Sequence, residues 1–311
     1  MAKAIRDVFG ESLAKYGKEN EKIVVLDADV SSSTKTSGFG KQFPDRFFNC
    51  GIAEYNMINM AAGLSTTDKI PFVNTFAVFL STIGALPARA LLSYTNLNVK
   101  LCGAYGGLSD AYDGPSHHAI EDIAIMRALP NFTVVVASDE YQTDWIVKTA
   151  IETEGPMYIR LSRASACAGY TADTKFTLGK ANVVKDGKDA TVIACGVMVQ
   201  QAIKAAELLK AKGIDVKVVD MFTVKPIDAE MIIKSAAETG AVVSAEEHNI
   251  MGGLGSAVAE VMATAGCTAP LEMVGLKDTH AETGAYDALL AKYGLDGAAI
   301  AAAVERAIAR K

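Results

Sequence analysis

FTVVVASDEYQTDWIVKTAIETEGPMYIRLS, residues 132–162, holds a β-branched run, a helical pattern and a second apolar run, in that order. We expect a strand over 132–138, a helix over 140–153 and a strand over 156–162. Both strand candidates are apolar on their two faces, which is typical of a parallel sheet covered by helices on both sides. The stretch therefore predicts a β-α-β unit and an α/β fold.

The same alternation continues in both directions along the chain. Further strands are expected at 22–28, 71–76, 98–103, 190–196, 215–221, 241–247 and 271–276. Further helices are expected at 2–16, 54–65, 79–94, 119–128, 199–212, 228–239, 256–265, 285–293 and 296–309. The alternation stops between 164 and 190, where an Asp-Gly pair in VVKDGKDATVI predicts a hairpin turn.

This break predicts two α/β domains. We expect a first domain over 1–165, with a doubly wound and mostly parallel sheet, and a linker over 166–185. A second, smaller α/β domain follows over 186–311. A chain of 311 residues, 50% of them hydrophobic, is long enough to bury two cores of ordinary size.

Composition argues against several classes of protein. The net charge of -6 disfavours a nucleic-acid binder, because a phosphate backbone is held mainly by excess Lys and Arg. Five scattered cysteines without a C-x-x-C pair fit the reduced thiols of a cytoplasmic protein. The N-terminus has no apolar core of signal-peptide type, and no run approaches the length of a membrane span. We therefore expect a cytoplasmic protein that binds neither nucleic acid nor membranes.

Common cofactor and metal motifs are missing from the sequence. It has no P-loop, and no G-x-G-x-x-G follows the first strand. Its four histidines lack metal-binding spacing, so we expect no metal site in this chain. MGGLGSAV, at 251–258, could bind an anion at a helix N-terminus, but the motif is weak and a tight turn with close packing is the favoured interpretation.

Two apolar stretches carry candidate site residues. In NCGIAEYNMINMAAGL, at 49–64, Glu54 is a single carboxylate at the start of an apolar helix. Taken alone, it is best explained as an ordinary first-turn acid. In NTFAVFL, at 74–80, Phe76 and Phe79 form either a core pair or an apolar slot for a heteroaromatic ring.

The stretch DAYDGPSHHAIED, at 110–122, predicts a turn followed by a helix. It places Asp113, Ser116, His117 and His118 on a loop at the end of a parallel strand, where ligands bind in such sheets. The alternative is that Ser116 caps the helix and the two histidines are solvated. The spacing does not decide between these interpretations.

Charged side chains also follow the strand in MYIRLSR, at 157–163. Arg160 and Arg163 with Ser162 could clamp a sugar phosphate, because the guanidinium fork matches phosphate geometry. Alternatively, one or both arginines form ion pairs with surface carboxylates.

Five stretches occur in the same order as in one family. GIAEYNMINMAAGL, NTFAVFL, DGPSHHAIEDIAIMRALP, IRLSR and EEHNIMGGLGSAVAEV together resemble the C-terminal half of transketolases. The resemblance spans the whole chain and implies a pyrimidine-binding domain followed by the family's C-terminal domain. Transketolases also carry an N-terminal Gly-Asp-Gly motif that holds Mg²⁺ and the diphosphate of thiamine diphosphate, and this sequence has none with the expected sequel.

The resemblance therefore implies the C-terminal subunit of a split transketolase, which transfers a two-carbon ketol unit between sugar phosphates. Its partner would be an N-terminal subunit carrying the diphosphate and Mg²⁺ site, in an α2β2 heterotetramer that shares the cofactor. The alternatives are the β subunit of a 2-oxoacid dehydrogenase, which lacks the DGPSHH signature, and a non-catalytic regulatory subunit. Deoxyxylulose-phosphate synthase is a more distant alternative.

By the same resemblance, Glu54 donates a hydrogen bond to the aminopyrimidine ring of thiamine diphosphate, which activates the cofactor. To donate, the carboxyl group must hold a proton at neutral pH. Apolar surroundings favour the uncharged form, whereas a helix N-terminus favours the carboxylate. We expect burial to prevail.

The resemblance assigns the remaining site residues as well. Phe76 and Phe79 would flank the pyrimidine ring, with Thr82 and Tyr105 completing the cofactor-binding set. Glu54, Asp113 and His117 would be catalytic, with Asp113 on a sugar hydroxyl. The substrate phosphate would lie near Lys35, His117, Ser162 and Arg163. Thr82 and Tyr105 stand where the family commonly has Tyr and His, so the identity of the donor sugar stays open.

Overall fold

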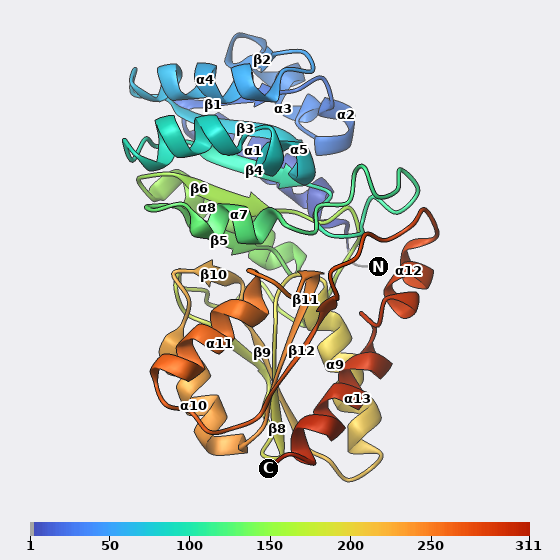
Figure 1. The fold of residues 1–311 in the computed structure, drawn as a ribbon. Coiled ribbons are helices and arrows are strands. Elements are labelled where there is room, and N and C mark those ends of the chain that lie inside the picture. The colour runs from blue at the N-terminus through green and yellow to red at the C-terminus, as the bar shows by residue number, and fades with distance from the viewer. Residues whose placement is uncertain (1–2) are drawn as a thin grey trace.

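The computed structural model describes residues 3–311 and contains two sheets, one in each half of the chain (Figure 1). The first sheet has the order β10-β5-β6-β4-β3-β1-β2. Its strands are β1 (Ile23–Asp27), β2 (Phe47–Asn49), β3 (Ile70–Phe76), β4 (Lys100–Ala104), β5 (Thr133–Val136), β6 (Met157–Arg160) and β10 (Thr223–Lys225). All neighbours are parallel except β10 and β5.

Helices cover both faces of this sheet. On one face lie α1 (Ile5–Glu19) and α8 (Glu140–Glu152). On the other lie α4 (Glu54–Ser65), α5 (Ala77–Thr82), α6 (Ala85–Pro87), the π-helical η2 (Ala88–Ser93) and α7 (Asp122–Ala128). Three short helices, α2 (Ser31–Thr34), α3 (Ser37–Gln42) and η1 (Pro44–Arg46), join β1 to β2. The strands β1, β3 and β4 are buried on both faces, as their apolar sequences predicted, whereas the edge strand β2 is not.

The second sheet has the order β12-β11-β8-β9-β7. Its strands are β7 (Asn182–Lys185), β8 (Ala190–Ala194), β9 (Val216–Asp220), β11 (Val242–Asn249) and β12 (Leu271–Leu276). The helices α9 (Met198–Lys210) and α13 (Gly297–Ile308) cover one face, and α10 (Ala229–Thr239) and α11 (Leu254–Thr264) cover the other. The short α12 (Tyr286–Lys292) precedes α13. Two mostly parallel, helix-covered sheets confirm the predicted fold class.

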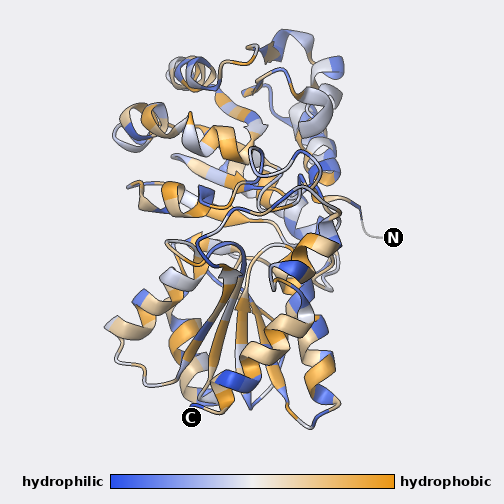
Figure 2. Ribbon diagram, turned by 45° about the vertical axis from the view of Figure 1, so that its right-hand side comes forward, coloured by the Kyte–Doolittle hydropathy of each residue, from blue (hydrophilic) through white to orange (hydrophobic). Residues whose placement is uncertain are grey.

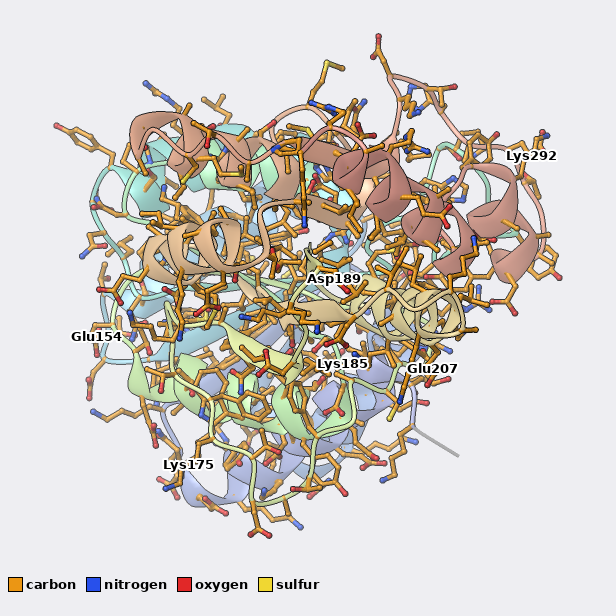
Figure 3. The ribbon with its side chains drawn as sticks, turned by 90° about the horizontal axis from the view of Figure 1, so that it is seen from below. Glu154, Lys175, Lys185, Asp189, Glu207 and Lys292 are labelled. Atoms are coloured by element: carbon orange, nitrogen blue, oxygen red, sulfur yellow. The ribbon has the colours of Figure 1, made fainter. Side chains whose placement is uncertain are left out.

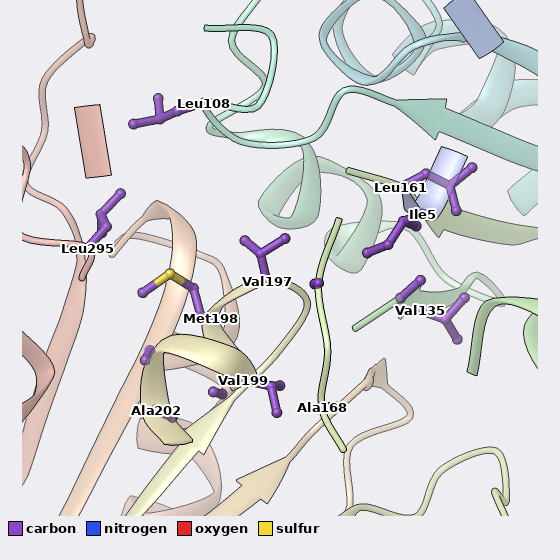
Figure 4. Packing of buried hydrophobic residues seen from close by; sticks show 14 of the residues in the cluster. Ile5, Leu108, Val135, Leu161, Ala168, Val197, Met198, Val199, Ala202 and Leu295 are labelled. Atoms are coloured by element: carbon purple, nitrogen blue, oxygen red, sulfur yellow. The ribbon is translucent and has the colours of Figure 1, made fainter. Parts of the chain in front are cut away.

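The colouring by hydropathy follows this layering. Strands of the second sheet are mainly apolar, and its helices alternate apolar and polar segments (Figure 2). Charged side chains such as Glu207 on α9 and Lys292 on α12 project from the periphery (Figure 3). One buried apolar cluster includes Val135 and Leu161 of the first half and Val197 and Met198 of the second half (Figure 4). The two halves therefore share a core.

Two strand pairings differ from the sequence prediction. The hairpin predicted at Asp186–Gly187 is wrong, because β7 pairs antiparallel with β9 and not with β8. Both edges of β8 are already occupied by β9 and β11. The sequence also missed β10, which comes from the second half of the chain and extends the first sheet beside β5. The strand β7 lies within the predicted linker, 166–185, but belongs to the second sheet. The boundaries between the two predicted domains stay a prediction.

The strand order of the first sheet locates its ligand crevice. From β1 the chain passes to β2 on one side and then to β3 on the other. Ligands of open parallel sheets bind outside the carboxyl ends of the strands at such a reversal. Asp27 at the end of β1 pairs in register with Asn74 near the end of β3. The loops that follow β1, β2 and β3 therefore surround this position.

Candidate active site

Glu54 is the first residue of α4, and its side chain is only 5% exposed. The chain turns into the helix through Gly51, whose φ of +67° suits glycine. Met57 and Ile58 on the same helix are fully buried. The Thr75 hydroxyl donates to Glu54 Oε1 at 3.3 Å. The carboxyl group is thus enclosed beside β3 at the strand reversal.

Phe76 directly follows Thr75, the partner of Glu54, and belongs to a group of four rings. We call Phe76, Phe79, Tyr105 and His117 the aromatic cluster. The Phe76 ring centroid lies 6.0 Å from that of Phe79 and 4.8 Å from that of Tyr105. The His117 ring meets Phe76 and Phe79 edge-on, at 5.7 and 5.2 Å. Phe76 and Phe79 are only half-buried, so part of each ring stays accessible. The arrangement offers apolar ring surface to a flat heteroaromatic ligand.

Two cations adjoin Tyr105. This residue is buried and has a φ of +62°, a conformation that a non-glycine residue adopts only when its surroundings enforce it. The Arg6 guanidinium donates to the Tyr105 hydroxyl. The guanidinium carbons of Arg6 and Arg163 lie 5.1 and 5.4 Å from the ring centroid, within cation–π range. Sequence reasoning missed Arg6, because nothing in the helical pattern of α1 distinguishes it.

Lys35 is placed by a buried carboxylate that the sequence reasoning also missed. Asp27, at the end of β1, accepts hydrogen bonds from the hydroxyls of Thr34 and Thr36 at 2.7 and 2.8 Å. Burial raises the pKa of Asp27. The Lys35 ammonium lies 3.4 Å from Asp7. An acid at the end of the first strand was the available sequence signal for this arrangement.

The loop after β4 holds Asp113 and His117. Asp113 is exposed, and its amide donates to the carbonyl of Asp110 at 3.3 Å. The Ser116 hydroxyl and His117 Nδ1 are 2.9 Å apart. Asp110 is fully buried, with Oδ1 3.4 Å from Arg163 Nη1. Burial and the adjacent Asp113 raise the pKa of Asp110 to about 7, against the pull of Arg163. Asp110 was not predicted, although it opens the same motif.

Three further residues were predicted to bind the substrate or the cofactor: Arg163, Ser162 and Thr82. Arg163 lies beside the ring of Tyr105. Its side chain is 41% exposed, so the guanidinium group is accessible to an anion. The adjacent Ser162 hydroxyl accepts from the amide of Ala164 at 3.1 Å. Thr82 is exposed, and its hydroxyl donates to the Val78 carbonyl within α5 at 2.6 Å. Within residues 3–311, this hydroxyl forms no hydrogen bond with the aromatic cluster.

Arg160 does not face the crevice, so its interpretation as a phosphate ligand is wrong. Its side chain is 5% exposed, and Nε lies 2.7 Å from Oδ2 of the buried Asp122. Nη2 also donates to the carbonyls of Ala119 and Glu247, at 2.9 and 3.0 Å. Arg160 is the last residue of β6 and is buried, whereas Arg163 follows the strand and is partly exposed. Arg160 therefore forms an ion pair, as the alternative interpretation expected, but its partner is the buried Asp122 and not a surface carboxylate.

The glycine loop at 251–258 binds a carboxylate of its own chain. The amides of Leu254 and Gly255, at the start of α11, donate to Glu246 at 2.6 and 2.8 Å. A Cβ atom at Gly253 would lie 2.0 Å from Glu246 Oε2, so a side chain has no room there. This confirms the tight turn with close packing.

His118 is buried, so the interpretation of two solvated histidines is wrong for this residue. Among residues 3–311, neither of its ring nitrogens has a hydrogen-bond partner. The same part of the chain holds no group of three acidic, Cys or His side chains suited to a metal. None of its helices is both long and apolar enough to cross a membrane.

Family models match both halves of the chain. The transketolase pyrimidine-binding domain matches residues 1–168, and the transketolase C-terminal domain matches residues 179–300. A protein described as a transketolase C-terminal section, from Methanocaldococcus jannaschii, is 46% identical over 96% of this chain and 94% of its own length. Human transketolase is 39% identical over 99% of this chain and 49% of its own length.

A solved structure shares the fold over the full length. A split-gene transketolase, described as an inactive β4 tetramer, superposes with a TM-score of 0.89. It is 48% identical, and the match covers 99% of both chains. These comparisons favour a transketolase over the β subunit of a 2-oxoacid dehydrogenase.

Proposed function

Because this chain belongs to the transketolase family, we propose that it is the C-terminal subunit of a thiamine-diphosphate-dependent transketolase. With an N-terminal partner it moves a two-carbon ketol unit from a ketose phosphate to an aldose phosphate. The observation that carries the proposal is the enclosed Glu54 carboxyl group, bonded to Thr75 at the end of β3, with the aromatic cluster beginning at the next residue, Phe76.

The Glu54 side chain is nearly inaccessible to solvent, and the Thr75 hydroxyl is its hydrogen-bond partner within residues 3–311. In the proposed site, Glu54 would donate a hydrogen bond to a ring nitrogen of the pyrimidine. Phe76 and Phe79 would hold that ring by apolar contact. When bound, thiamine diphosphate supplies the carbon nucleophile for ketol transfer.

The positive side chains nearby suit a phosphorylated sugar. Arg163 lies against the Tyr105 ring and His117 belongs to the aromatic cluster, while Lys35 pairs with Asp7, the neighbour of Arg6. Guanidinium and ammonium groups both bind phosphate oxygens. The exposed Asp113 offers a carboxylate to a sugar hydroxyl. These side chains support a sugar position beside the aromatic cluster, with its phosphate toward Arg163.

We assign the diphosphate and Mg²⁺ to a partner subunit in an α2β2 heterotetramer. Large apolar side chains are exposed at the start of α4 and at the neighbouring α6: Ile52 by 84%, Tyr55 by 45%, Ile83 by 49% and Leu86 by 58%. Exposed apolar groups gathered around a site are typical of a surface that another chain covers. The β4 assembly of a 48% identical relative is described as inactive, which supports a need for a second kind of subunit.

The partner requirement predicts weak cofactor binding by the isolated chain. Titration calorimetry with thiamine diphosphate and Mg²⁺ is expected to show at least roughly 100-fold weaker binding by this chain alone than by the pair, because the diphosphate contacts are absent. Equal affinity for the isolated chain and the pair would contradict the shared site.

The substrate phosphate assignment predicts a selective effect of Arg163→Gln. The KM for a ketose phosphate is expected to rise roughly 10- to 100-fold, because hydrogen bonds to a charged group contribute about 1.5–3 kcal/mol. The KM for the same ketose without its phosphate serves as the control and is expected to stay within about twofold. An equal rise for both ketoses would exclude a phosphate contact by Arg163.

A further inference from the structure

The carboxyl group of Asp110 is an unusual feature of the site. The residue is fully buried, and Oδ2 has no hydrogen-bond partner among residues 3–311. Its other oxygen contacts Arg163, at 3.4 Å from Nη1. An unpaired buried carboxylate oxygen is costly, and the neighbouring Asp113 carboxyl group adds to that cost when both groups are ionised.

Arg163 is held by Asp110 on one side only. Nη1 lies near Oδ1 and the backbone oxygen of Asp110, at 3.4 and 3.5 Å. The guanidinium group also approaches the ring of Tyr105, and 41% of the side chain remains exposed. Its other N–H groups can therefore bind an anion while Nη1 stays with Asp110.

We propose that Asp110 is a positioning residue for Arg163, and that its carboxyl group takes up a proton when the anionic end of the substrate binds. This rests on the proposed function, because it takes Arg163 as the ligand of the substrate phosphate. An ionised Asp110 offsets the charge of Arg163 and repels the anion, whereas a protonated Asp110 leaves Arg163 its full charge.

The charged groups around Asp110 are consistent with this coupling. Asp113, on the same loop, opposes ionisation of Asp110, while Arg163 beyond β6 and Arg6 on α1 favour it. With burial, these influences raise the pKa of Asp110 to about 7. A bound anion adds a further negative charge, which raises this pKa again. Affinity is therefore highest below about pH 7 and falls as the pH rises through the pKa of the anion complex.

Inorganic sulfate is the appropriate probe, because its charge stays constant over this pH range. The full chain is titrated with sulfate at constant ionic strength between about pH 6 and pH 9, and sulfate inhibition of the reconstituted pair is measured in parallel. We expect affinity to fall roughly tenfold over this range, which corresponds to a shift of about one unit in the pKa of Asp110. Calorimetry in buffers of different ionisation enthalpy is expected to show proton uptake near pH 7.5.

Asp110→Asn is expected to bind sulfate with the same affinity at every pH and without proton uptake. His117→Asn is the control, because a histidine beside the anion could give the same trend; this variant should keep the pH dependence. Asp113→Asn lies on the surface and should move the midpoint to lower pH, since it removes a charge that raises the pKa of Asp110.

Two results would overturn the proposal in distinguishable ways. Sulfate binding that follows pH equally in the parent and in Asp110→Asn excludes Asp110 as the proton acceptor, and leaves the phosphate role of Arg163 intact. Absence of sulfate binding at every pH overturns that role as well. Should Asp110→Asn fail to fold, an unchanged midpoint in Asp113→Asn would equally contradict the proposal.

Discussion

Glu54→Gln is expected to lower the kcat of the reconstituted pair by roughly 100- to 10,000-fold, the range that a positioned proton donor contributes. The amide cannot hold or release the proton that the carboxyl group exchanges with the pyrimidine. Its carbonyl oxygen can still accept from Thr75, so the local fold should persist. Kinetics of two-carbon transfer, with thermal unfolding as a check on folding, measures the effect.

Glu140→Gln is the matched control for this variant. Glu140 is also the first residue of a helix, α8, and that helix covers the other face of the sheet. An effect of the helix terminus alone is worth about 1 kcal/mol or less and would be similar at both positions. If Glu54→Gln retains activity within about twofold, as Glu140→Gln should, Glu54 is an ordinary first-turn acid and the proposed mechanism is wrong.

Asp122→Asn is expected to destabilise the protein by about 3–5 kcal/mol at neutral pH, because it leaves the buried Arg160 without its carboxylate. The pKa of Asp122 is depressed by Arg160 and by the Tyr158 hydroxyl, despite burial, which acts to raise it. Its stabilising contribution is therefore complete above the ordinary pKa of about 3.9 and is lost as the pH falls below that value. Denaturant unfolding at pH 7, repeated at lower pH, tests this sign.

The exposed pair of Lys148 and Glu152 provides the comparison. Its atoms are 4.0 Å apart on α8, and both side chains are more than half exposed. Glu152→Gln is expected to lower the free energy of unfolding by less than about 0.5 kcal/mol.

Since Arg160 also donates to the Glu247 carbonyl on β11, Asp122→Asn should loosen the contact between the two halves. A loss below about 1 kcal/mol for Asp122→Asn would contradict the structural role given to this pair.

The helices and strands that repeat a clear apolar period were predictable, and those that depend on distant pairing were not. The helix starting at Glu54 and the strand ending at Phe76 could be read from local patterns. The three residues of β10 could not, since their partner β5 is about 90 residues earlier in the sequence. The Asp-Gly pair predicted a local hairpin, but β7 pairs with the more distant β9.

The site divides in a similar way. Motif order predicted Glu54, Phe76, Phe79 and His117 as site residues, and the structure brings the last three together as rings in contact. The motifs could not show that Arg160 is buried while Arg163 is accessible. The burial of Arg160 depends on its contacts with Asp122 and with the second half of the chain. Asp27 contacts Thr34 and Thr36 in the loop after β1, and Asp110 contacts Arg163 beyond β6. The sequence shows both acids but does not show these partners.

The most direct test of the proposed function is an assay of two-carbon transfer with this chain, an N-terminal transketolase subunit, thiamine diphosphate and Mg²⁺. Each subunit is assayed alone and in the mixture, with a ketose phosphate as donor and an aldose phosphate as acceptor. The mixture is expected to yield an aldose phosphate two carbons shorter than the donor and a ketose phosphate two carbons longer than the acceptor, while neither subunit alone does so. Transfer by this chain alone, or none by the mixture with a panel of ketose phosphates, would contradict the proposal.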